Sequence, residues 1–475
     1  MRSVIVILAT ALLAAPFAFA ADASLEERVA ELERKLKLLG VETPHDATLD
    51  ERVALLEERV EQLLHDRGPV EHVEAKPDEH QPVAEVLGVA EPIDHRDDQE
   101  DLHFLGSAEG DMAEHVTIEG DHEESPESEI GEVLSGYAEM HYNNTGGEPS
   151  ELDFQRFVIN FGHRFTRHIR FWSQLELEHA FTSGEREESG ELALSQAYMD
   201  FILNPHLTFR SGIMLTPVGM INERHEPATF NGVERPVVET LIIPSSWSDA
   251  GFGLTGQFGN GIRYRTFLMG GLNAEHFEAD QGIREGRQFG FRSNFNQPAK
   301  VGRLEYLGTP GLALGMSLYS GGAGYAVPGV NPRVDIFEFD GRYGYHRFDF
   351  RGLFANVWIS EADKLNEEIE HETGHNPNVA SQLRGFYLEP AVHLLRRERH
   401  QDVIAFARYE NYDTQRVMPH GFSAHPEYDR DAWFIGLTYK PTQDIAFKID
   451  YVFRNSESLT HESRNGFNAG IGWWF

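Results

Sequence analysis

Residues 444–454 read Asp-Ile-Ala-Phe-Lys-Ile-Asp-Tyr-Val-Phe-Arg (DIAFKIDYVFR), and a fold follows from their alternation. One side of this stretch is apolar, at Ile445, Phe447, Ile449, Tyr451 and Phe453, and the other carries Lys448, Asp450 and Arg454. A period of two is typical of a β-strand with one apolar and one polar face. The same pattern returns in residues 154–165 (FQRFVINFGHRF), 169–179 (IRFWSQLELEH) and 206–215 (HLTFRSGIML).

Three features favour a transmembrane barrel over a soluble sandwich for residues 131–475. Charged side chains lie at strand centres, where they need a water-filled lumen, while the apolar faces can turn to lipid. Tight turns such as Asn204-Pro205 alternate with long polar connections such as 361–381 and 414–429. The chain ends on an alternating strand, residues 465–475 (NGFNAGIGWWF), whose aromatic-x-Phe ending resembles the insertion signal of Gram-negative outer-membrane proteins.

Sixteen segments fit as strands, the first near residues 132–143 and the last near 465–475, with 286–297 as an uncertain additional one. An even number is expected of single-chain bacterial barrels, and about sixteen strands leave an aqueous channel. No later stretch approaches the roughly 18 apolar residues that a spanning helix needs. The predicted fold class is therefore an all-β transmembrane protein, with a 16-stranded antiparallel outer-membrane β-barrel over 131–475.

Composition narrows the class further. Residues 1–20 combine one basic residue, a short apolar run and the sequence Ala18-Phe19-Ala20, which predicts a secretory signal peptide. The chain has no cysteine, so disulfides and cysteine-based sites are excluded. Its formal net charge is −36, and no basic face exists to attract DNA or RNA, so nucleic acid is not expected as a partner.

Residues 21–65 carry an α-helical coiled-coil seam ahead of the barrel. Apolar side chains recur at 4-3-4-3 spacing at Leu25, Val29, Leu32, Leu36 and Leu39, and again from Leu49 to Leu63, with Pro44 between. A repeat of 3.5 residues is typical of a coiled coil, so self-association is expected. The alternative is a helical hairpin that folds on itself across residues 40–44.

Residues 66–130 form an acidic segment with three basic residues against 21 aspartates and glutamates. Low hydrophobicity and high charge of one sign predict a disordered linker. Scattered histidines, from His72 to His122, allow a weak buffer for divalent cations such as zinc. Spacings of seven or more residues make no chelating face, which favours a solvated spacer.

Four blocks of the barrel region carry a resemblance. They read LNPHLTFRSGIMLTPVGMINERHEPATFNGVERPVVETLIIPSSWSDAGFGLTG (203–256), GRLEYLGTPGLALGMSLYSG (302–321), RGLFANVWIS (351–360) and ARYENYDTQ (407–415). In sequence and order they resemble the phosphate-selective porin O/P family of Gram-negative outer-membrane porins. The resemblance implies a trimeric sixteen-stranded porin, an inward-folded loop that narrows each pore, and an N-terminal region in the periplasm.

The connection 217–249 is the candidate for that constriction, because an insertion of about thirty residues inside a barrel is expected to be functional. Arginines on inferred lumen faces would attract anions. The predicted pore-lining residues are Arg156, Arg164, Arg170, Arg210, Arg224, His225, Arg235, Arg263, Arg265 and Arg303. Acidic residues share those faces, including Glu176, Glu305, Glu338 and Asp450, so the arginines could equally be paired across strands. The lysine cluster of phosphate-specific family members has no match in the sequence.

The stretch His371-Glu372-Thr373-Gly374-His375 (HETGH) matches the H-E-x-x-H zinc-protease motif. Gly374 would cost a helix about 1 kcal/mol relative to alanine, and Asn376-Pro377 would end it. A loop also lacks the buried partners that orient metal-bound histidines. We therefore expect no enzyme activity, no catalytic or metal site, and no cofactor.

The sequence as a whole predicts an outer-membrane porin for passive diffusion of small hydrophilic solutes, with anions such as phosphate as a candidate class. The expected partners are outer-membrane lipid and two further copies of the chain in a homotrimer. Two alternatives remain open: a structural tether that uses the periplasmic coiled coil, and capture of divalent metal by the linker and loops.

Overall fold

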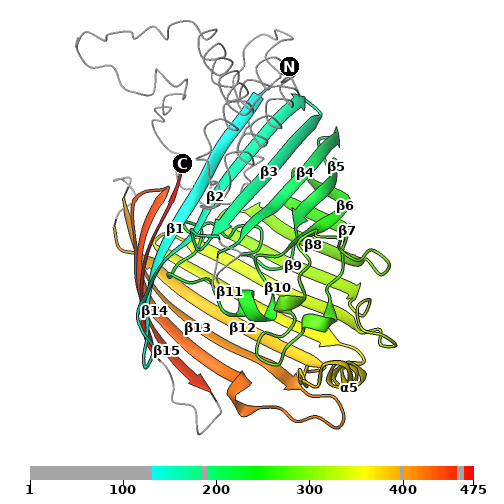
Figure 1. Cartoon of the computed structure of the whole chain (residues 1–475). Helices are drawn as coiled ribbons and strands as arrows, with labels where there is room; N and C mark the ends of the chain where they lie inside the picture. Colours follow the sequence, from blue (N-terminus) through cyan, green and yellow to red (C-terminus); the bar gives the residue numbers. More distant parts are fainter. Residues whose placement is uncertain (1–130, 183–189, 396–400, 457–464) are drawn as a thin grey trace, which may run out of the picture. The chain divides into compact units, whose positions relative to one another are not determined.

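A computed structural model of the chain describes residues 131–182, 190–395, 401–456 and 465–475. Within them, sixteen antiparallel strands close into a barrel in which each strand pairs with its sequence neighbours and β1 pairs with β16 (Figure 1). The strands are β1 (Gly131–Thr145), β2 (Glu151–Thr166), β3 (Ile169–Glu178), β4 (Leu192–Asn204), β5 (Leu207–Leu215), β6 (Ser248–Gln257), β7 (Ile262–Met269), β8 (Ala299–Thr309), β9 (Leu312–Gly322), β10 (Arg333–Tyr345), β11 (Phe348–Ile359), β12 (Gln382–His393), β13 (Asp402–Val417), β14 (Asp429–Thr442), β15 (Ile445–Ser456) and β16 (Gly466–Trp474).

The predicted count of sixteen strands is confirmed, and residues 286–297 are not a further strand but turns and bends. Closure lies between the first and last strands, where Tyr137 pairs with Trp474 and Asn144 with Phe467. The terminal residue takes part, since Phe475 and Gly136 exchange backbone hydrogen bonds of 2.8 and 2.9 Å. The predicted signal peptide, coiled coil and acidic linker lie outside the described residues.

The two ends of the barrel differ in the length of their connections. One end has the tight turns 167–168, 205–206 and 443–444, while the other has long connections such as 216–247, 270–298 and 360–381. Short turns at one end and long loops at the other are typical of outer-membrane barrels. Below, these are called the turn end and the loop end.

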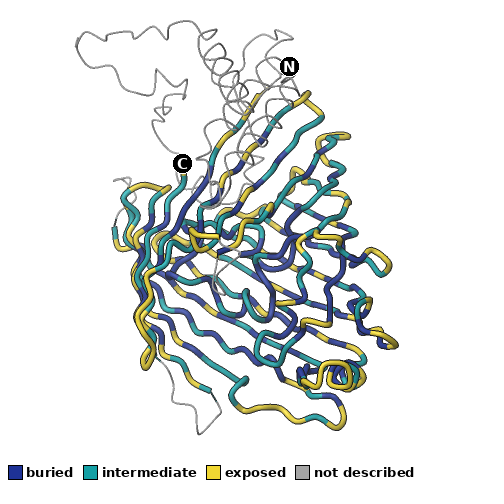
Figure 2. Tube along the Cα trace, in the orientation of Figure 1, coloured by how far each residue is buried: buried dark blue, intermediate teal, exposed yellow. Residues whose placement is uncertain are grey.

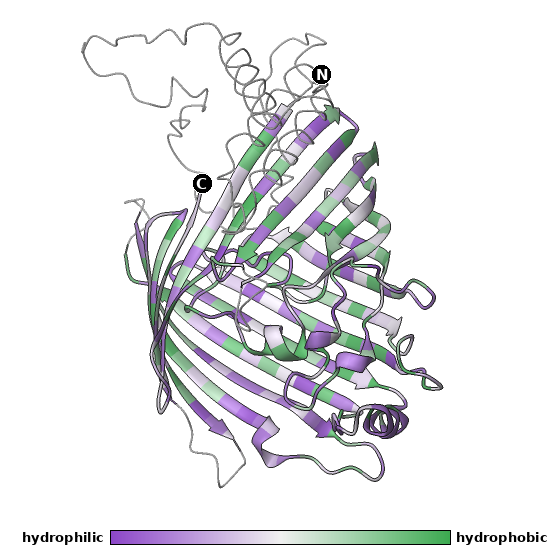
Figure 3. Cartoon of the chain, viewed as in Figure 1, coloured by the Kyte–Doolittle hydropathy of each residue, from purple (hydrophilic) through white to green (hydrophobic). Residues whose placement is uncertain are grey.

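The outer face of the barrel is apolar, as predicted from the alternation. On β15, Phe447, Ile449, Tyr451 and Phe453 are each more than 40% exposed, whereas Lys448 and Asp450 between them are buried. Exposed and buried residues alternate along many strands in Figure 2, and apolar and polar ones alternate in Figure 3. Among the described residues, no helix has the length and apolar character to cross a bilayer.

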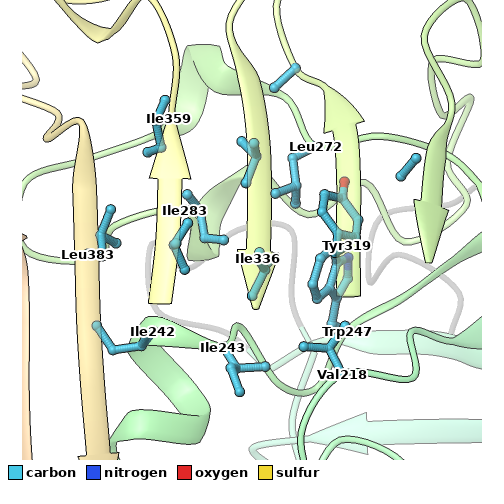
Figure 4. Packing of buried hydrophobic residues seen from close by; sticks show 14 of the residues in the cluster. Val218, Ile242, Ile243, Trp247, Leu272, Ile283, Tyr319, Ile336, Ile359 and Leu383 are labelled. Atoms are coloured by element: carbon cyan, nitrogen blue, oxygen red, sulfur yellow. The ribbon is translucent and has the colours of Figure 1, made fainter. Parts of the chain in front are cut away.

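The inner face is not uniformly polar, which differs from the prediction. A hydrophobic cluster fills part of the interior and includes strand residues such as Tyr319, Ile336 and Leu383. Side chains of the long connections pack against them, among them Ile243, Trp247 and Ile283 (Figure 4). The cause is inward folding of those connections, which gives part of the lumen wall a protein neighbour in place of water.

The connection between β11 and β12 contains the helix α5 (Ala362–Thr373), whose Leu365 and Ile369 belong to the same hydrophobic cluster. Gly374 ends the helix in the left-handed conformation, with φ 75°. His375 therefore lies beyond the helix and does not share a helical face with His371. Among the residues that the structure describes, no group of three or more histidine, aspartate or glutamate side chains is arranged to hold a metal ion.

Candidate functional site

The connection 216–247 leaves the barrel wall between β5 and β6 and crosses the interior to the opposite wall. Its backbone is hydrogen-bonded there by side chains from four strands, β11, β13, β14 and β15, and β12 contacts its side chains. Arg351 donates to the carbonyl of Thr229 at 2.8 Å, and Lys440 donates to that of Ala228 at 2.7 Å. Such a span places a folded segment across the lumen, as predicted for 217–249. We call residues 216–247 the crossing loop.

Carboxylates of the far wall hold the N–H groups of the crossing loop. Val233 N–H donates to Asp450 at 2.7 Å, and Val238 N–H donates to Glu410 at 3.0 Å. Both carboxylates are buried, as is the backbone that they bind. Hydrogen bonds to charged groups are worth about 1.5–3 kcal/mol each, so these contacts fix the loop against the wall.

Arg408 on β13 is the centre of this attachment and is fully buried. Its Nε donates to Glu410 at 2.8 Å, and its Nη1 lies 3.2 Å from Glu389. The same guanidinium donates to the loop carbonyls of Asn231 at 3.2 Å and Glu234 at 3.3 Å. One cation therefore joins two wall carboxylates to two backbone oxygens of the crossing loop.

Glu239 secures the other end of the crossing loop, in the short helical turn η2 (Val238–Ile242). Its carboxyl group accepts hydrogen bonds from Tyr387 Oη and from Ile221 N–H, both at 2.7 Å. Complete burial raises the pKa of Glu239 to about 7, because an ionised carboxylate is poorly solvated there. The group therefore changes charge within the physiological range.

Predicted residue Arg156 lies inside the barrel and is paired with three carboxylates: Glu139 at 2.7 Å, Glu176 at 3.0 Å and Glu178 at 3.5 Å. Predicted residues His225 and Arg235 lie on the crossing loop nearby. Burial, followed by the neighbouring charge of Arg235, lowers the pKa of His225 to about 4, so this imidazole is neutral at pH 7. Arg235 donates to Ser246 Oγ at 2.8 Å and to the carbonyl of His225 at 3.3 Å.

A second ionic group surrounds predicted residue Arg303, which contacts Asp340 at 2.7 Å, Glu338 at 3.1 Å and Glu305 at 3.2 Å. Glu305 also pairs with predicted residue Arg265 at 2.6 Å. The crossing loop reaches this group as well. Predicted residue Arg224 lies 3.8 Å from Glu305, and Glu223 lies 3.1 Å from Arg265.

The remaining predicted arginines are also engaged by neighbours. Arg210 donates twice to Asp200, at 2.8 and 3.0 Å, and lies over the ring of Tyr198. Arg170 lies 3.8 Å from Asp200, and Arg263 donates to Gln257. Arg164 on β2 lies opposite Arg170 on β3 in the strand register. Its side chain also has an interaction partner. Pairing across strands, the alternative drawn from the sequence, therefore accounts for most of these arginines.

A basic group that the sequence did not reveal lies on the inner wall toward the turn end. It comprises Arg342, Arg351, Lys440 and Lys448, from strands β10, β11, β14 and β15. Lys448 is 4% exposed, and its ammonium lies 3.7 Å from the ring centre of Phe230 without a hydrogen-bond partner among the described residues. The alternation in the sequence predicts that Lys448 points inward. It does not predict that Lys448 lies close to Lys440, Arg342 and Arg351.

A second connection, 270–298, folds over the crossing loop. Arg284 donates to the carbonyl of Thr240 at 2.8 Å, and Arg287 donates to that of Ser246 at 2.7 Å. Thr414 on β13 donates to the carbonyl of Ala279 at 2.7 Å, so this connection also reaches the far wall. The interior therefore holds two stacked segments.

A protein of Aquifex aeolicus (strain VF5), described as uncharacterized, is 34% identical to the chain over 353 residues, which are 73% of this chain and 80% of that protein. The chain belongs to the family of this Aquifex protein. No family model matches the chain, so membership of the phosphate-selective porin O/P family stays a prediction.

Solved structures that resemble the chain include a loop-deletion form of OmpT, an outer membrane protein of Vibrio cholerae, with a TM-score of 0.49 and 10% identity over 73% of this chain and 99% of that one. The anion-selective porin from Comamonas acidovorans has a TM-score of 0.49 and 12% identity, with 73% and 100% covered. The outer membrane channel DcaP of Acinetobacter baumannii has a TM-score of 0.48 and 11% identity, with 74% and 99% covered. Because these TM-scores are below 0.5, the fold of the chain is assigned from its own strand pairing and not from these similarities.

Proposed function

We propose that the chain is an outer-membrane porin through which small hydrophilic solutes diffuse passively. The observation that carries this proposal is the contrast between an apolar outer face and a charged interior in one closed barrel. A closed barrel satisfies every backbone hydrogen bond within a bilayer, and its apolar band can meet lipid. The long connections would then face the outside of the cell, and the termini the periplasm.

The passage would run beside the crossing loop, where the inner charges keep contact with water. Among the predicted arginines that form the ion pairs described above, Arg170 and Arg224 are the most exposed. Their side chains are 27% and 22% accessible. Glu178 and Glu223 are similarly accessible, at 32% and 18%. Mixed charge of this kind favours small polar solutes of either sign, with specificity set mainly by width. The more deeply buried arginines would hold the wall and the loop in place.

A preference for anions such as phosphate would come from the basic group formed by Arg342, Arg351, Lys440 and Lys448. Lys440 and Arg351 are occupied by loop carbonyls, and Arg342 pairs with Asp349 at 2.8 Å. Lys448 is the member whose ammonium has no hydrogen-bond partner among the described residues. The Lys448 ammonium is buried beneath Phe230, so an anion in the passage would be attracted by the summed charge of these cations and would not contact that ammonium directly.

Planar-bilayer recording of the full chain tests the proposal. We expect discrete current steps, and in a salt gradient a reversal potential that reports a weak ion preference. Phosphate should reduce the chloride current if the basic group holds it, and Lys448→Gln should weaken that block. A folded protein that gives no current steps would contradict the porin proposal, while steps without phosphate block would contradict only the anion preference.

The homotrimer is part of the proposal. The predicted coiled coil of residues 21–65 would bring three copies together, and the barrels would meet through their apolar outer faces. Native mass spectrometry of the full chain and of a form without residues 21–130 tests this. The full chain should be trimeric, and three simultaneous conductance levels should accompany it.

A further inference from the structure

A cavity of about 370 Å³ lies on the outer face of the barrel, at the loop end of β12 to β15. It is lined by Arg384, Asn411, Asp413, Arg416, Asp429, Asp431 and Asn455. The alternation along the strands places the cavity outside, because residues two apart on a strand face the same side. Asn411 faces outward like Tyr409, and Asp431 faces outward like Trp433. Arg408 and Glu410, in contrast, point inward. Small-molecule sites typically have volumes of roughly 300–1,000 Å³. We call this cavity the outer pocket.

The outer pocket begins one side chain above a row of aromatic rings. Phe386, Tyr409 and Trp433 follow one another across β12, β13 and β14, with ring centres 6.0 and 4.9 Å apart. Phe453 continues the row, since it pairs with Trp433 in the strand register. Aromatic rings gather where a barrel passes from hydrocarbon to headgroups.

Each aromatic residue is followed by a polar one two residues closer to the loop end. On β12 the pair is Phe386 and Arg384, and on β14 it is Trp433 and Asp431. Tyr409 with Asn411 and Phe453 with Asn455 repeat the arrangement on β13 and β15. The change from aromatic to polar side chains therefore occurs at the same height on four strands. Because aromatic rings mark the boundary between hydrocarbon and headgroups, the outer pocket lies at the level of the lipid headgroups.

Connections from the loop end are hydrogen-bonded to the end of β13, next to the pocket. Gln415 donates to the carbonyl of Asn378 at 2.7 Å and accepts from His425 N–H at 2.7 Å. Asn378 in turn donates to the carbonyl of Ser423 at 3.1 Å. Asp413 is only 8% exposed although it lies on the outer face. The pocket is thus a recess lined by polar side chains of β12 to β15.

The charges in the outer pocket form no direct ion pairs with one another, unlike those inside the barrel, although Arg416 and Asp413 attract each other at longer range. Neither Arg384 nor Arg416 forms an ion pair with any of the described residues, and the same is true of Asp429. Asp413 accepts from Gln415 N–H, and Asp431 accepts from Asn455. Two guanidiniums and at least one carboxylate are therefore available to a ligand. The lining carries three negative and two positive groups.

We propose that the outer pocket binds the headgroup of an aminophospholipid, a phosphate ester joined to a primary ammonium. The guanidiniums would hold the phosphate through charge-assisted hydrogen bonds, and the aspartates would hold the ammonium. A purely anionic headgroup would meet three carboxylates, and a purely cationic one would meet two guanidiniums. The acyl chains would lie below, along the apolar outer face of β12 to β15. The inference rests on the membrane orientation in the proposed function, but not on conduction.

Native mass spectrometry of the purified full chain in detergent, mixed with phosphatidylethanolamine, phosphatidylglycerol or phosphatidylcholine, tests the proposal. Phosphatidylethanolamine should be retained in preference to the other two. The double variant Arg384→Gln/Arg416→Gln should weaken its retention about a hundredfold or more, since each lost charge-assisted hydrogen bond costs about a factor of ten or more. The double variant Asp429→Asn/Asp431→Asn should weaken phosphatidylethanolamine as well, without weakening phosphatidylglycerol.

Arg333 and Asp335 provide the matched control. They lie at the loop end of β10, at a distance of 3.0 Å from each other, and both are more than two-fifths exposed. Arg333→Gln/Asp335→Asn removes the same kinds of charge from an already paired site, so lipid retention should not change. The charge-preserving variant Arg384→Lys/Arg416→Lys should keep much of the binding, which separates loss of a site from loss of folding.

Equal retention of phosphatidylglycerol and phosphatidylethanolamine would overturn the proposal in favour of a simple anion site. Equal retention of all three lipids, or an equal loss in the Arg333 control, would show unspecific contact with the apolar face. Single-channel conductance of the pocket variants should match that of the unaltered chain, because the altered side chains lie outside the bore. A failure of lipid preference is thus distinguishable from a failure of the porin proposal.

Discussion

The replacement Arg408→Met probes the attachment of the crossing loop to the far wall. Arg408 has no exposed surface and lies between Glu389, Glu410 and the ring of Phe434, whose centre is 4.4 Å from the guanidinium carbon. Methionine fills a similar length but supplies no charge. Two buried carboxylates then lose their cation, and the carbonyls of Asn231 and Glu234 lose a donor.

The expected loss of stability is large. Removing one partner of a buried ion pair destabilises a protein by about 3–5 kcal/mol, because the remaining charge stays desolvated. Two remaining carboxylates share this effect, and Glu410 still accepts from Val238 N–H. We expect the crossing loop to leave the wall before the strands separate, since the strands keep their own ladder of hydrogen bonds.

Two assays follow the change. Urea unfolding of the barrel in lipid vesicles should show a midpoint lowered in proportion to about 3–5 kcal/mol. Planar-bilayer recording should show larger and noisier open-channel currents, because the loop no longer has a fixed position. The triple variant Arg408→Met/Glu389→Gln/Glu410→Gln should recover part of the stability, since neutral amides tolerate burial better than unpaired carboxylates.

An unchanged unfolding midpoint together with unchanged current noise in Arg408→Met would show that Arg408 does not hold the crossing loop. A triple variant less stable than the single one would also contradict this role. The exposed-pair variant Arg333→Gln serves as the control and should change the free energy of unfolding by about 1 kcal/mol or less.

Three further predictions concern other parts of the barrel. Arg224→Gln should shift the reversal potential toward cations, with a twofold to fivefold change in permeability ratio at about 0.4–1 kcal/mol, and an unchanged potential would remove Arg224 from the passage. Neutral Glu239 stabilises the crossing loop fully below pH 4.5, and this contribution of about 3 kcal/mol is lost as pH rises through about 7. Current noise should therefore increase as pH rises from about 4.5 to about 7 in the unaltered chain and level off above pH 7, with no such change in Glu239→Gln, and equal pH dependence in both would contradict this assignment. Ile449→Lys, on the outer face, should destabilise the barrel in vesicles by about 2–4 kcal/mol, and a neutral effect on urea unfolding would contradict contact with lipid.

The strands could be predicted from the sequence because each has a local signal. Residues 445–453 alternate with a period of two, and the tight turns lie where that period is interrupted, so both strand number and facing follow from neighbours in the chain. The barrel closes where β1 pairs with β16, with Tyr137 opposite Trp474. An even number of strands makes these two strands antiparallel, so their pairing needs no further signal in the sequence.

The interior could not be predicted in the same way. The alternation predicts that Ile336 and Leu353 face inward. The side chains that pack against them, however, come from connections that carry no periodic pattern. Ile243 and Trp247 on the crossing loop complete that packing. A wet lumen wall and a wall covered by a folded loop have the same strand alternation, and only the three-dimensional path of the loop distinguishes them.

The residues of the candidate site and the alternative of pairing across strands could be read from the sequence, but the individual partners could not. Arg156 and Glu176 were both placed on inner faces, and their 3.0 Å contact joins adjacent strands. Arg408 was not singled out, because its role depends on carbonyls 174 and 177 residues away in sequence. Long-range contacts of this kind leave no mark on local composition.

The central claim is that water and solutes occupy the inside of the barrel beside Arg224, while residues such as Ile435 face lipid. The chain has no cysteine, so single cysteines can be introduced and labelled without interference. In planar bilayers, a charged, membrane-impermeant thiol reagent should reduce the current of Arg224→Cys in a single irreversible step and leave that of Ile435→Cys unchanged. Modification of Ile435→Cys with no effect at Arg224→Cys would contradict the account.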